Sequence, residues 1–210
     1  MQIEALGRGL FRLLVPFEDL YTTVYVVQEE TGVTIIDAAT YPSDVDTYIL
    51  PAIEKLGIDG GDVRLLLLTH DHGDHAGGLA RLAERLPDAT VGAAFAIDAP
   101  RFLPLRDGQL LSERVRVVSL PGHTKDSVAF LDTETNTLLS GDCLQLGGVG
   151  KYRNGIAYPH LYRASVERLM TMDVERIVAA HEYDPLGSVA TGREAVARYL
   201  DTCLSFLKTD

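Results

Sequence analysis

Residues 63–78 read Val-Arg-Leu-Leu-Leu-Leu-Thr-His-Asp-His-Gly-Asp-His-Ala-Gly-Gly. The first six residues form an apolar run of strand length, which predicts a strand buried on both faces. Histidines and aspartates follow directly in the run from His70 to His75. The stretch therefore predicts a buried strand that delivers a cluster of polar, metal-binding side-chain types.

Histidines elsewhere in the chain lie in similar places. The chain has six histidines, and five of them follow predicted strands or lie in glycine-rich loops: His70, His72, His75, His123 and His181. A neutral imidazole is the commonest metal ligand in proteins, and carboxylates complete sites for divalent cations. A chance match to His-x-His-x-Asp-His has odds on the order of one in a few thousand. We therefore interpret the histidines as metal ligands.

The spacing of the ligands favours two ions. In an extended loop, residues i and i+2 point to the same side, so His70 and His72 can converge on one ion. Asp74 and His75 follow where the loop passes into a helix, and can turn toward a second ion. Asp142, at another predicted strand end, is a carboxylate that can bridge both.

The remaining chain alternates predicted strands and helices without a linker. Predicted strands are 21–28, 33–36, 63–68, 90–95, 115–120, 128–131, 137–139 and 176–180, and predicted helices are 43–56, 79–86, 161–172 and 191–207. Ser43 is the expected N-cap of the first helix, Pro51 a kink and Gly57 its end. Hairpins mixed with helices predict an α/β (α+β) fold with two sheets covered by helices, within a single domain over residues 1–210.

The composition and net charge of the chain limit the partners and the location that we expect for it. The 210 residues are 46% hydrophobic and 23% charged, the balance of a globular protein. We expect no membrane span and no signal peptide. A net charge of −11 disfavours nucleic acid as a partner. Two cysteines, Cys143 and Cys203, are too few for a disulfide framework, so a cytoplasmic location is expected; a homodimer is left open.

Four segments resemble the metallo-β-lactamase superfamily of hydrolases, in its order along the chain: 69–78, Pro121-Gly122-His123-Thr124, Ser140-Gly141-Asp142 and Ala180-His181-Glu182-Tyr183. The resemblance implies a four-layer αββα sandwich with the site at one edge. It also implies that His70, His72 and His123 bind one metal, that Asp74, His75 and His181 bind a second, and that Asp142 bridges them. Asp74 and Asp142 are the implied catalytic residues. Cys143 is one residue away from the cysteine-ligand position of true β-lactamases, and is expected to be a buried thiol.

Within the superfamily, the run from Gly141 to Lys151 is similar to glyoxalase II-type (hydroxyacylglutathione hydrolase-like) thioesterases. That similarity implies substrate contacts by Lys151 and Tyr183, and we add Tyr152 and Arg153 as candidates. Arg153 stands where that family often has a tyrosine. The chain also ends soon after Leu207, before that family's C-terminal helical region. The similarity therefore favours thioesters without specifying glutathione.

The predicted function is a hydrolase with two divalent ions, zinc first and iron or manganese as alternatives. A metal-bridged hydroxide would attack a small ester, thioester or lactone carbonyl, and Tyr152, Tyr158 or Tyr183 could act as general acid. The alternatives are a mononuclear iron persulfide dioxygenase-like oxidoreductase, a lactonase of the same superfamily, a metallo-nuclease and a non-catalytic metal-binding module. The nuclease is disfavoured by the acidic charge.

Three further features of the sequence lead to predictions about single residues. Asp37 resembles a family position that supports the metal ligands from behind, although a plain turn or N-cap aspartate is nearly as well supported. Gly77 and Gly78 are expected to allow close packing of a helix against a loop. His160 is expected to be a surface or capping residue.

Overall fold

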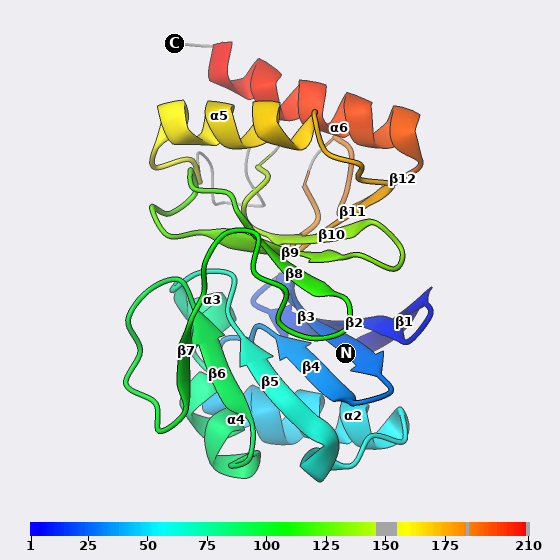
Figure 1. The fold of residues 1–210 in the computed structure, drawn as a ribbon, viewed down its shortest axis with the longest axis vertical. Helices are drawn as coiled ribbons and strands as arrows, with labels where there is room; N and C mark the ends of the chain where they lie inside the picture. The colour runs from blue at the N-terminus through cyan, green and yellow to red at the C-terminus, as the bar shows by residue number, and fades with distance from the viewer. Residues whose placement is uncertain (146–154, 184, 209–210) are drawn as a thin grey trace. The chain divides into compact units, whose positions relative to one another are not determined.

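The structure is a computed structural model that describes residues 1–145, 155–183 and 185–208 (Figure 1). The chain divides into two compact units, Met1–Leu105 (unit 1) and Arg106–Asp210 (unit 2). Each unit contains one sheet and its own helices. Among the described residues, no helix combines the length and the apolar character needed to cross a bilayer.

Unit 1 is built on a seven-stranded sheet with the order β1-β2-β3-β4-β5-β6-β7. Its strands are β1 Gln2–Gly7, β2 Leu10–Phe17, β3 Leu20–Glu29, β4 Gly32–Ile36, β5 Val63–Leu67, β6 Thr90–Ala93 and β7 Phe102–Pro104. Strands β1 to β4 are antiparallel, whereas β4 to β7 are parallel. The carboxyl ends of β4 and β5 therefore lie side by side at one edge, which places Asp37 next to the segment that follows β5.

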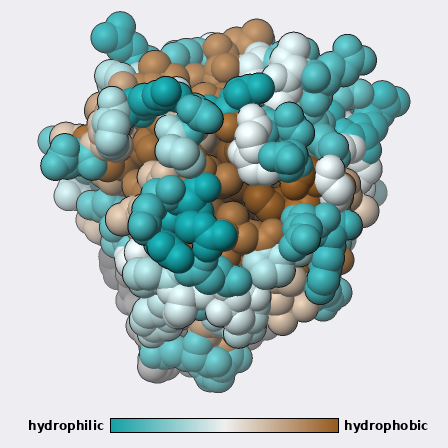
Figure 2. Space-filling model, turned by 90° about the horizontal axis from the view of Figure 1, so that it is seen from below, coloured by the Kyte–Doolittle hydropathy of each residue, from teal (hydrophilic) through white to brown (hydrophobic). Residues whose placement is uncertain are grey.

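The helices of unit 1 pack their apolar residues against this sheet. They are α1 Pro42–Asp44, a π-helical turn Val45–Ile49, α2 Leu50–Lys55, a 3₁₀ turn Gly60–Asp62, α3 Gly73–Ala76 and α4 Leu79–Arg85. Val45, Ile49 and Leu82 join strand residues in one buried cluster. Half-buried Leu50 of α2 and Ala83 of α4 also pack against it. Viewed from below, where α2 and α4 lie in Figure 1, the surface shows an apolar area bordered by hydrophilic residues (Figure 2).

The predicted kink at Pro51 appears as the π-helical turn that precedes it. The Leu50 N–H bonds to the carbonyl of Val45, five residues back. Proline has no N–H, and its ring crowds the carbonyl four residues earlier, so the ladder widens before it. The Ser43 N-cap prediction is wrong, because the helix starts at Pro42 with Tyr41 as N-cap. The Tyr41 N–H donates to Oδ2 of Asp44 over 2.8 Å, which closes the first turn.

Unit 2 contains a five-stranded sheet with the order β12-β11-β10-β9-β8. Its elements are β8 Val115–Ser119, β9 Val128–Asp132, β10 Thr137–Gly141, α5 Pro159–Leu169, β11 Arg176–Ala179, β12 Val189–Thr191, α6 Arg193–Ser205 and a 3₁₀ turn Phe206–Lys208. Strands β10 and β11 are parallel, and the other pairs are antiparallel. Helices α5 and α6 lie side by side over one face of this sheet (Figure 1).

The predicted fold class is confirmed: the chain is mixed α/β with two sheets. All the predicted strands and helices are present within a few residues. The strands β1, β2, β7 and β12 are missing from the prediction. Two of them have only three residues, too few to show a period-two pattern. The single-domain organisation over residues 1–210 stays a prediction.

Candidate metal centre

Unit 1 places four predicted ligands after β5: His70, His72, Asp74 and His75, called here the unit-1 donors. They are held from behind by Asp37. One Asp37 carboxylate oxygen accepts the Thr69 backbone N–H over 2.8 Å, and the Thr69 hydroxyl lies 2.9 Å from the other. The Asp37 N–H in turn donates to the Leu67 carbonyl over 2.8 Å. The loop after β5 is thus tied to the end of β4.

Asp37 also orients His75. The Nδ1 atom of His75 lies 2.8 Å from Oδ2 of Asp37, with both side chains fully buried. Because a carboxylate only accepts hydrogen bonds, Nδ1 carries the proton and Nε2 keeps its lone pair for a ligand. The expectation that Asp37 supports a ligand from behind therefore agrees with its contacts, whereas a plain N-cap role does not.

The same logic extends to His70. Its Nδ1 lies 3.0 Å from the Thr69 hydroxyl. Since that hydroxyl donates its single proton to Asp37, its oxygen accepts from His70, and the Nε2 lone pair of His70 is presented. The ring centroids of His70 and His75 are 4.3 Å apart, and those of His70 and His72 are 4.7 Å apart. Three imidazoles therefore converge within unit 1.

Gly77 and Gly78 allow this convergence. A Cβ at Gly77 would lie 1.9 Å from the carbonyl oxygen of Thr40, and one at Gly78 would lie 2.1 Å from that of Ala38. The predicted close packing of helix against loop is confirmed. The Ala38 N–H donates to the His75 carbonyl over 2.7 Å across the same contact, so the loop after β4 supports the helix that carries His75.

Unit 2 supplies three further predicted ligands, His123, Asp142 and His181, called here the unit-2 donors. Gly141 of β10 is paired with Ala179 of β11, and the two strands are parallel. Asp142 and His181 therefore follow neighbouring strand ends at the same edge of the sheet. His123 follows β8 in the loop from Pro121 to Thr124, and its Nδ1–H donates to the Gly155 carbonyl.

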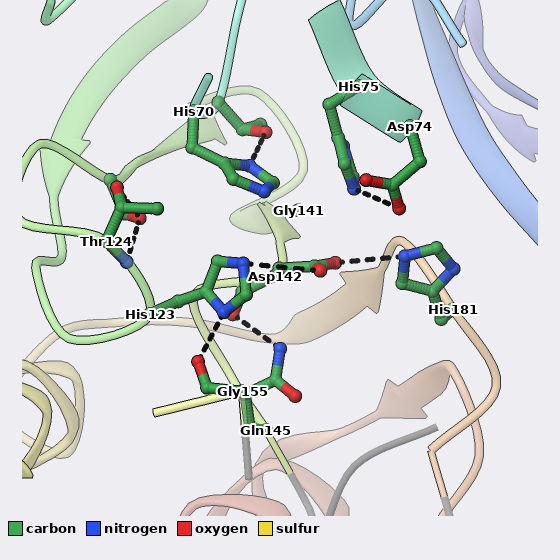
Figure 3. Close-up of polar contacts among 12 residues, drawn as sticks. His70, Asp74, His75, His123, Thr124, Gly141, Asp142, Gln145, Gly155 and His181 are labelled. Carbon is green, nitrogen blue, oxygen red and sulfur yellow. Dashed lines mark hydrogen bonds and ion pairs between the residues drawn. The ribbon is translucent and has the colours of Figure 1, made fainter. Parts of the chain in front are cut away.

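The Asp142 carboxylate lies between the two histidines of its unit (Figure 3). Its Oδ1 is 3.4 Å from Nε2 of His181, and its Oδ2 is 3.6 Å from Nε2 of His123. Both histidines are buried. One carboxylate that turns a different oxygen to each of two imidazole nitrogens has the arrangement required of a bridging ligand.

The donor separations fit divalent cations. Two donor atoms bound at about 2.0–2.2 Å to a tetrahedral ion lie roughly 3.3–3.6 Å apart. Within unit 2 the two separations are 3.4 and 3.6 Å, and in unit 1 the Asp74 Oδ2 to His75 Nε2 separation is 3.5 Å. A hydrogen bond between nitrogen and oxygen is shorter, about 2.7–3.2 Å. Each of these three donor pairs is therefore spaced as two ligands of one ion would be.

The sequence prediction missed Gln145, a buried residue that contacts this region. Its side-chain nitrogen lies 3.0 Å from the Asp142 carbonyl oxygen and 3.0 Å from the Tyr183 hydroxyl. Its backbone N–H and carbonyl both bond to the Tyr162 hydroxyl. Burial raises the pKa of the Tyr162 phenol well above its ordinary value, so this hydroxyl stays a donor. A buried glutamine without a charged neighbour in sequence gives no motif by which it could have been found.

The other predicted residues differ in placement. Lys151, Tyr152 and Arg153 lie outside the described residues. Tyr183 is fully buried, with its ring edge-to-face against His181 at 6.0 Å between centroids. Tyr158 is 42% exposed at the start of α5. His160 is exposed in the first turn of α5, and Cys143 is a buried thiol outside any disulfide, as predicted for both.

Relatives of known name match much of the chain. The uncharacterized protein YobT of Bacillus subtilis (strain 168) is 36% identical over 151 residues, which are 59% of this chain and 62% of that protein. A hydroxyacylglutathione hydrolase of Xanthomonas axonopodis pv. citri (strain 306) is 33% identical over 172 residues, which are 80% of this chain and 62% of that protein. The matches thus span less than two thirds of the length of these relatives.

Solved structures share the fold. A metallo-beta-lactamase family protein from Thermus thermophilus has a TM-score of 0.77, covering 97% of this chain and 81% of that chain at 22% identity. The subclass B3 metallo-beta-lactamase of Bradyrhizobium japonicum has a TM-score of 0.74 at 19% identity, covering 99% of this chain and 92% of that chain. The model of the family described as the Metallo-beta-lactamase superfamily matches residues 18–181, which include all seven predicted ligands. The chain therefore belongs to the metallo-beta-lactamase superfamily.

Proposed function

We propose that the chain is a metal-dependent hydrolase that holds two divalent ions, zinc in first place, and cleaves a small ester, thioester or lactone. The observation that carries the proposal is the Asp142 carboxylate, with one oxygen 3.4 Å from His181 and the other 3.6 Å from His123. A carboxylate placed in this way can be shared by two ions, and a pair of ions is what hydrolytic chemistry of this kind uses.

In this proposal the unit-1 donors and the unit-2 donors serve one centre. His70, His72 and His123 would hold one ion, and Asp74, His75 and His181 would hold the other, with Asp142 shared. Support comes from the superfamily match, which includes both donor sets. The hydrogen bonds of Asp37 to His75 and of Gly155 to His123 fix the ring tautomers that present Nε2.

Divalent ions held by these donors supply a nucleophile from water at neutral pH and polarise a carbonyl group. Asp74 and Asp142 are the carboxylates that would hold the attacking water in line with the carbonyl. A thiolate leaves without protonation, whereas an alkoxide benefits from a general acid. Tyr183, whose hydroxyl accepts a hydrogen bond from Gln145, is one proposed acid, and Tyr158 is the exposed alternative.

Thioesters come first among the candidate substrates. Several curated relatives are named hydroxyacylglutathione hydrolase, at 28–36% identity. Lys151, Arg153, Tyr152 and Tyr183 remain the proposed substrate contacts. The proposal also keeps a small carbonyl compound as the partner in place of nucleic acid or membrane. It keeps the cytoplasm as the compartment, to which two buried cysteines outside any disulfide conform.

The test is a panel of thioesters, lactones and esters assayed on protein of measured metal content. We expect two zinc ions per chain and turnover of at least one substrate class. Asp142→Ala should abolish turnover and lower the metal content, whereas Asp201→Ala, an exposed change on α6, should do neither. Full activity of Asp142→Ala would refute the bridging role.

Two other results would replace the proposal. One iron per chain, with oxygen uptake in place of hydrolysis, would identify an oxidoreductase related to persulfide dioxygenases. Bound metal without turnover of any activated ester would identify a metal-binding module.

A further inference from the structure

The side chain of a buried glutamine, Gln145, lies against groups that adjoin each of the three unit-2 donors. Gln145 is 4% exposed, and it follows β10 three residues after Asp142. Its side chain reaches the Asp142 backbone, the Tyr183 hydroxyl and the backbone at Gly155. These contacts concern Asp142, His181 and His123 respectively, as the next paragraphs show.

The orientation of the Gln145 amide follows from its partners. The Asp142 carbonyl oxygen can only accept a hydrogen bond, so the side-chain atom 3.0 Å from it must be the NH₂ nitrogen. The same nitrogen donates its second proton to the Tyr183 hydroxyl over 3.0 Å. Both N–H groups of the amide are therefore used, one on the Asp142 main chain and one on the tyrosine that packs against His181.

The amide oxygen lies at the segment that supports His123. A Cβ at Gly155 would be 2.7 Å from Oε1 of Gln145, so the Gln145 amide lies close against the backbone of Gly155. The Gly155 carbonyl accepts the Nδ1–H of His123 (Figure 3). The Gln145 side chain therefore lies beside the residue whose carbonyl holds the His123 ring.

Helix α5 holds Gln145 itself. The Tyr162 hydroxyl donates to the Gln145 carbonyl over 2.7 Å and accepts its N–H over 2.9 Å. Tyr162 and Tyr183 are both fully buried. Two hydrogen bonds to a buried hydroxyl therefore hold the backbone of Gln145 beside Asp142.

We propose that Gln145 is a positioning residue that sets the geometry of His123, Asp142 and His181 together, and through them the affinity for metal. This inference rests on the proposed function, since it concerns the same centre. Removing partners that orient metal ligands typically weakens metal binding by ten- to a hundredfold. We expect an effect of that size here, because the side chain of Gln145 lies against groups that adjoin three predicted ligands.

The experiment measures zinc affinity directly, by titrating metal-stripped protein with zinc against a chromophoric chelator. Gln145→Leu removes both donors at similar volume, and we expect at least one zinc equivalent to bind ten- to a hundredfold more weakly. Gln109→Leu is the matched control in the same unit, because its side-chain oxygen bonds only locally to the Arg106 N–H. Thermal unfolding with chelator present reports on the fold separately from metal binding.

A second variant guards against a folding failure. Gln145→Glu keeps the shape of the side chain but replaces the donor nitrogen that faces Asp142, so it should also weaken zinc binding. A purely structural role would lower the unfolding temperature of the metal-free protein and leave the zinc affinity of the folded variant unchanged. Zinc affinity within twofold of wild type in a folded Gln145 variant would overturn the inference and leave the proposed function standing. A wild-type chain that binds no zinc would overturn the proposed function, and this inference with it.

Discussion

The contacts of Asp37 show how one residue orients two of the four unit-1 donors. It adopts a left-handed backbone conformation, with φ of 66°, that costs energy for most residues other than glycine, asparagine and aspartate. In that conformation its carboxylate reaches Thr69 and His75 at once. These hydrogen bonds orient His75 directly and His70 through Thr69.

Asp37→Asn is the sharpest test of this role, because asparagine tolerates the left-handed backbone. Its NH₂ group would face donors at Thr69 or His75, so a buried N–H would lose its acceptor at a cost of about 1–3 kcal/mol. We expect roughly ten- to a hundredfold weaker zinc binding in a chelator competition. Asp59→Asn, exposed and local in its contacts, should match wild type. Unchanged zinc affinity in Asp37→Asn would exclude the orienting role.

The buried thiol of Cys203 leads to a prediction about how the free energy of unfolding depends on pH. Burial raises its pKa from 9.0 to about 12. Above pH 9 the unfolded chain loses a proton that the folded chain keeps, so this thiol makes the free energy of unfolding fall as pH rises. The decrease is about 1.4 kcal/mol per pH unit between the two pKa values.

The measurement is the free energy of unfolding in urea from pH 7 to 10.5, under reducing conditions. Cys203→Ala should lose stability more slowly than wild type above pH 9, and the two curves should run parallel below pH 8. Curves that stay parallel over the whole range would show that the thiol ionises in the folded protein.

At the scale of elements, the contact between α3 and the loop after β4 depends on the absence of a side chain at residues 77 and 78. A Cβ there would meet backbone oxygens, which cannot move aside as a flexible side chain could. By contrast, a Cβ at Gly73, in the first turn of α3, meets nothing within 4 Å.

We therefore expect Gly77→Ala to destabilise the metal-free protein by about 1–3 kcal/mol, the usual cost of overpacking. Gly73→Ala should be neutral or slightly stabilising, since alanine favours a helix over glycine by up to about 1 kcal/mol. Urea unfolding of both variants checks the pair. Equal stability of the two variants would mean that the loop after β4 moves away from the helix at little cost in free energy.

At the scale of the whole molecule, a centre assembled from the donors of both units would link metal binding to stability. A ligand that binds only the folded chain stabilises it by about 2.7 kcal/mol at a hundred times its dissociation constant. We expect the unfolding temperature to rise with zinc concentration and to fall when a chelator is added. Asp142→Ala should show a much smaller rise. An unfolding temperature that does not respond to zinc would contradict a metal centre in the folded protein.

The sequence alone predicted most of the strands and helices and the residues that are proposed as metal donors. A strand such as Val63–Leu67 is specified by local apolar patterning, and a run of histidines directly after it leaves few chemical roles. The close packing at Gly77 and Gly78 was also predicted from the sequence, although paired glycines that are merely flexible were the alternative. Short strands such as β7 and β12 were not predicted, because three residues are too few to show a periodic pattern. Their pairing comes from neighbouring strands.

Only the tertiary structure decided which contacts orient the predicted ligands. His75 lies 38 residues from Asp37, and Gln145 lies 38 residues from Tyr183 and 17 from Tyr162. Hydrogen bonds between such distant residues depend on strand order and on helix packing, which local sequence patterns do not encode. The cluster from His70 to His75 indicates its chemistry in the sequence, and the family resemblance already pointed to Asp37, but the contacts of Asp37 and the buried amide of Gln145 become visible only when the chain is folded.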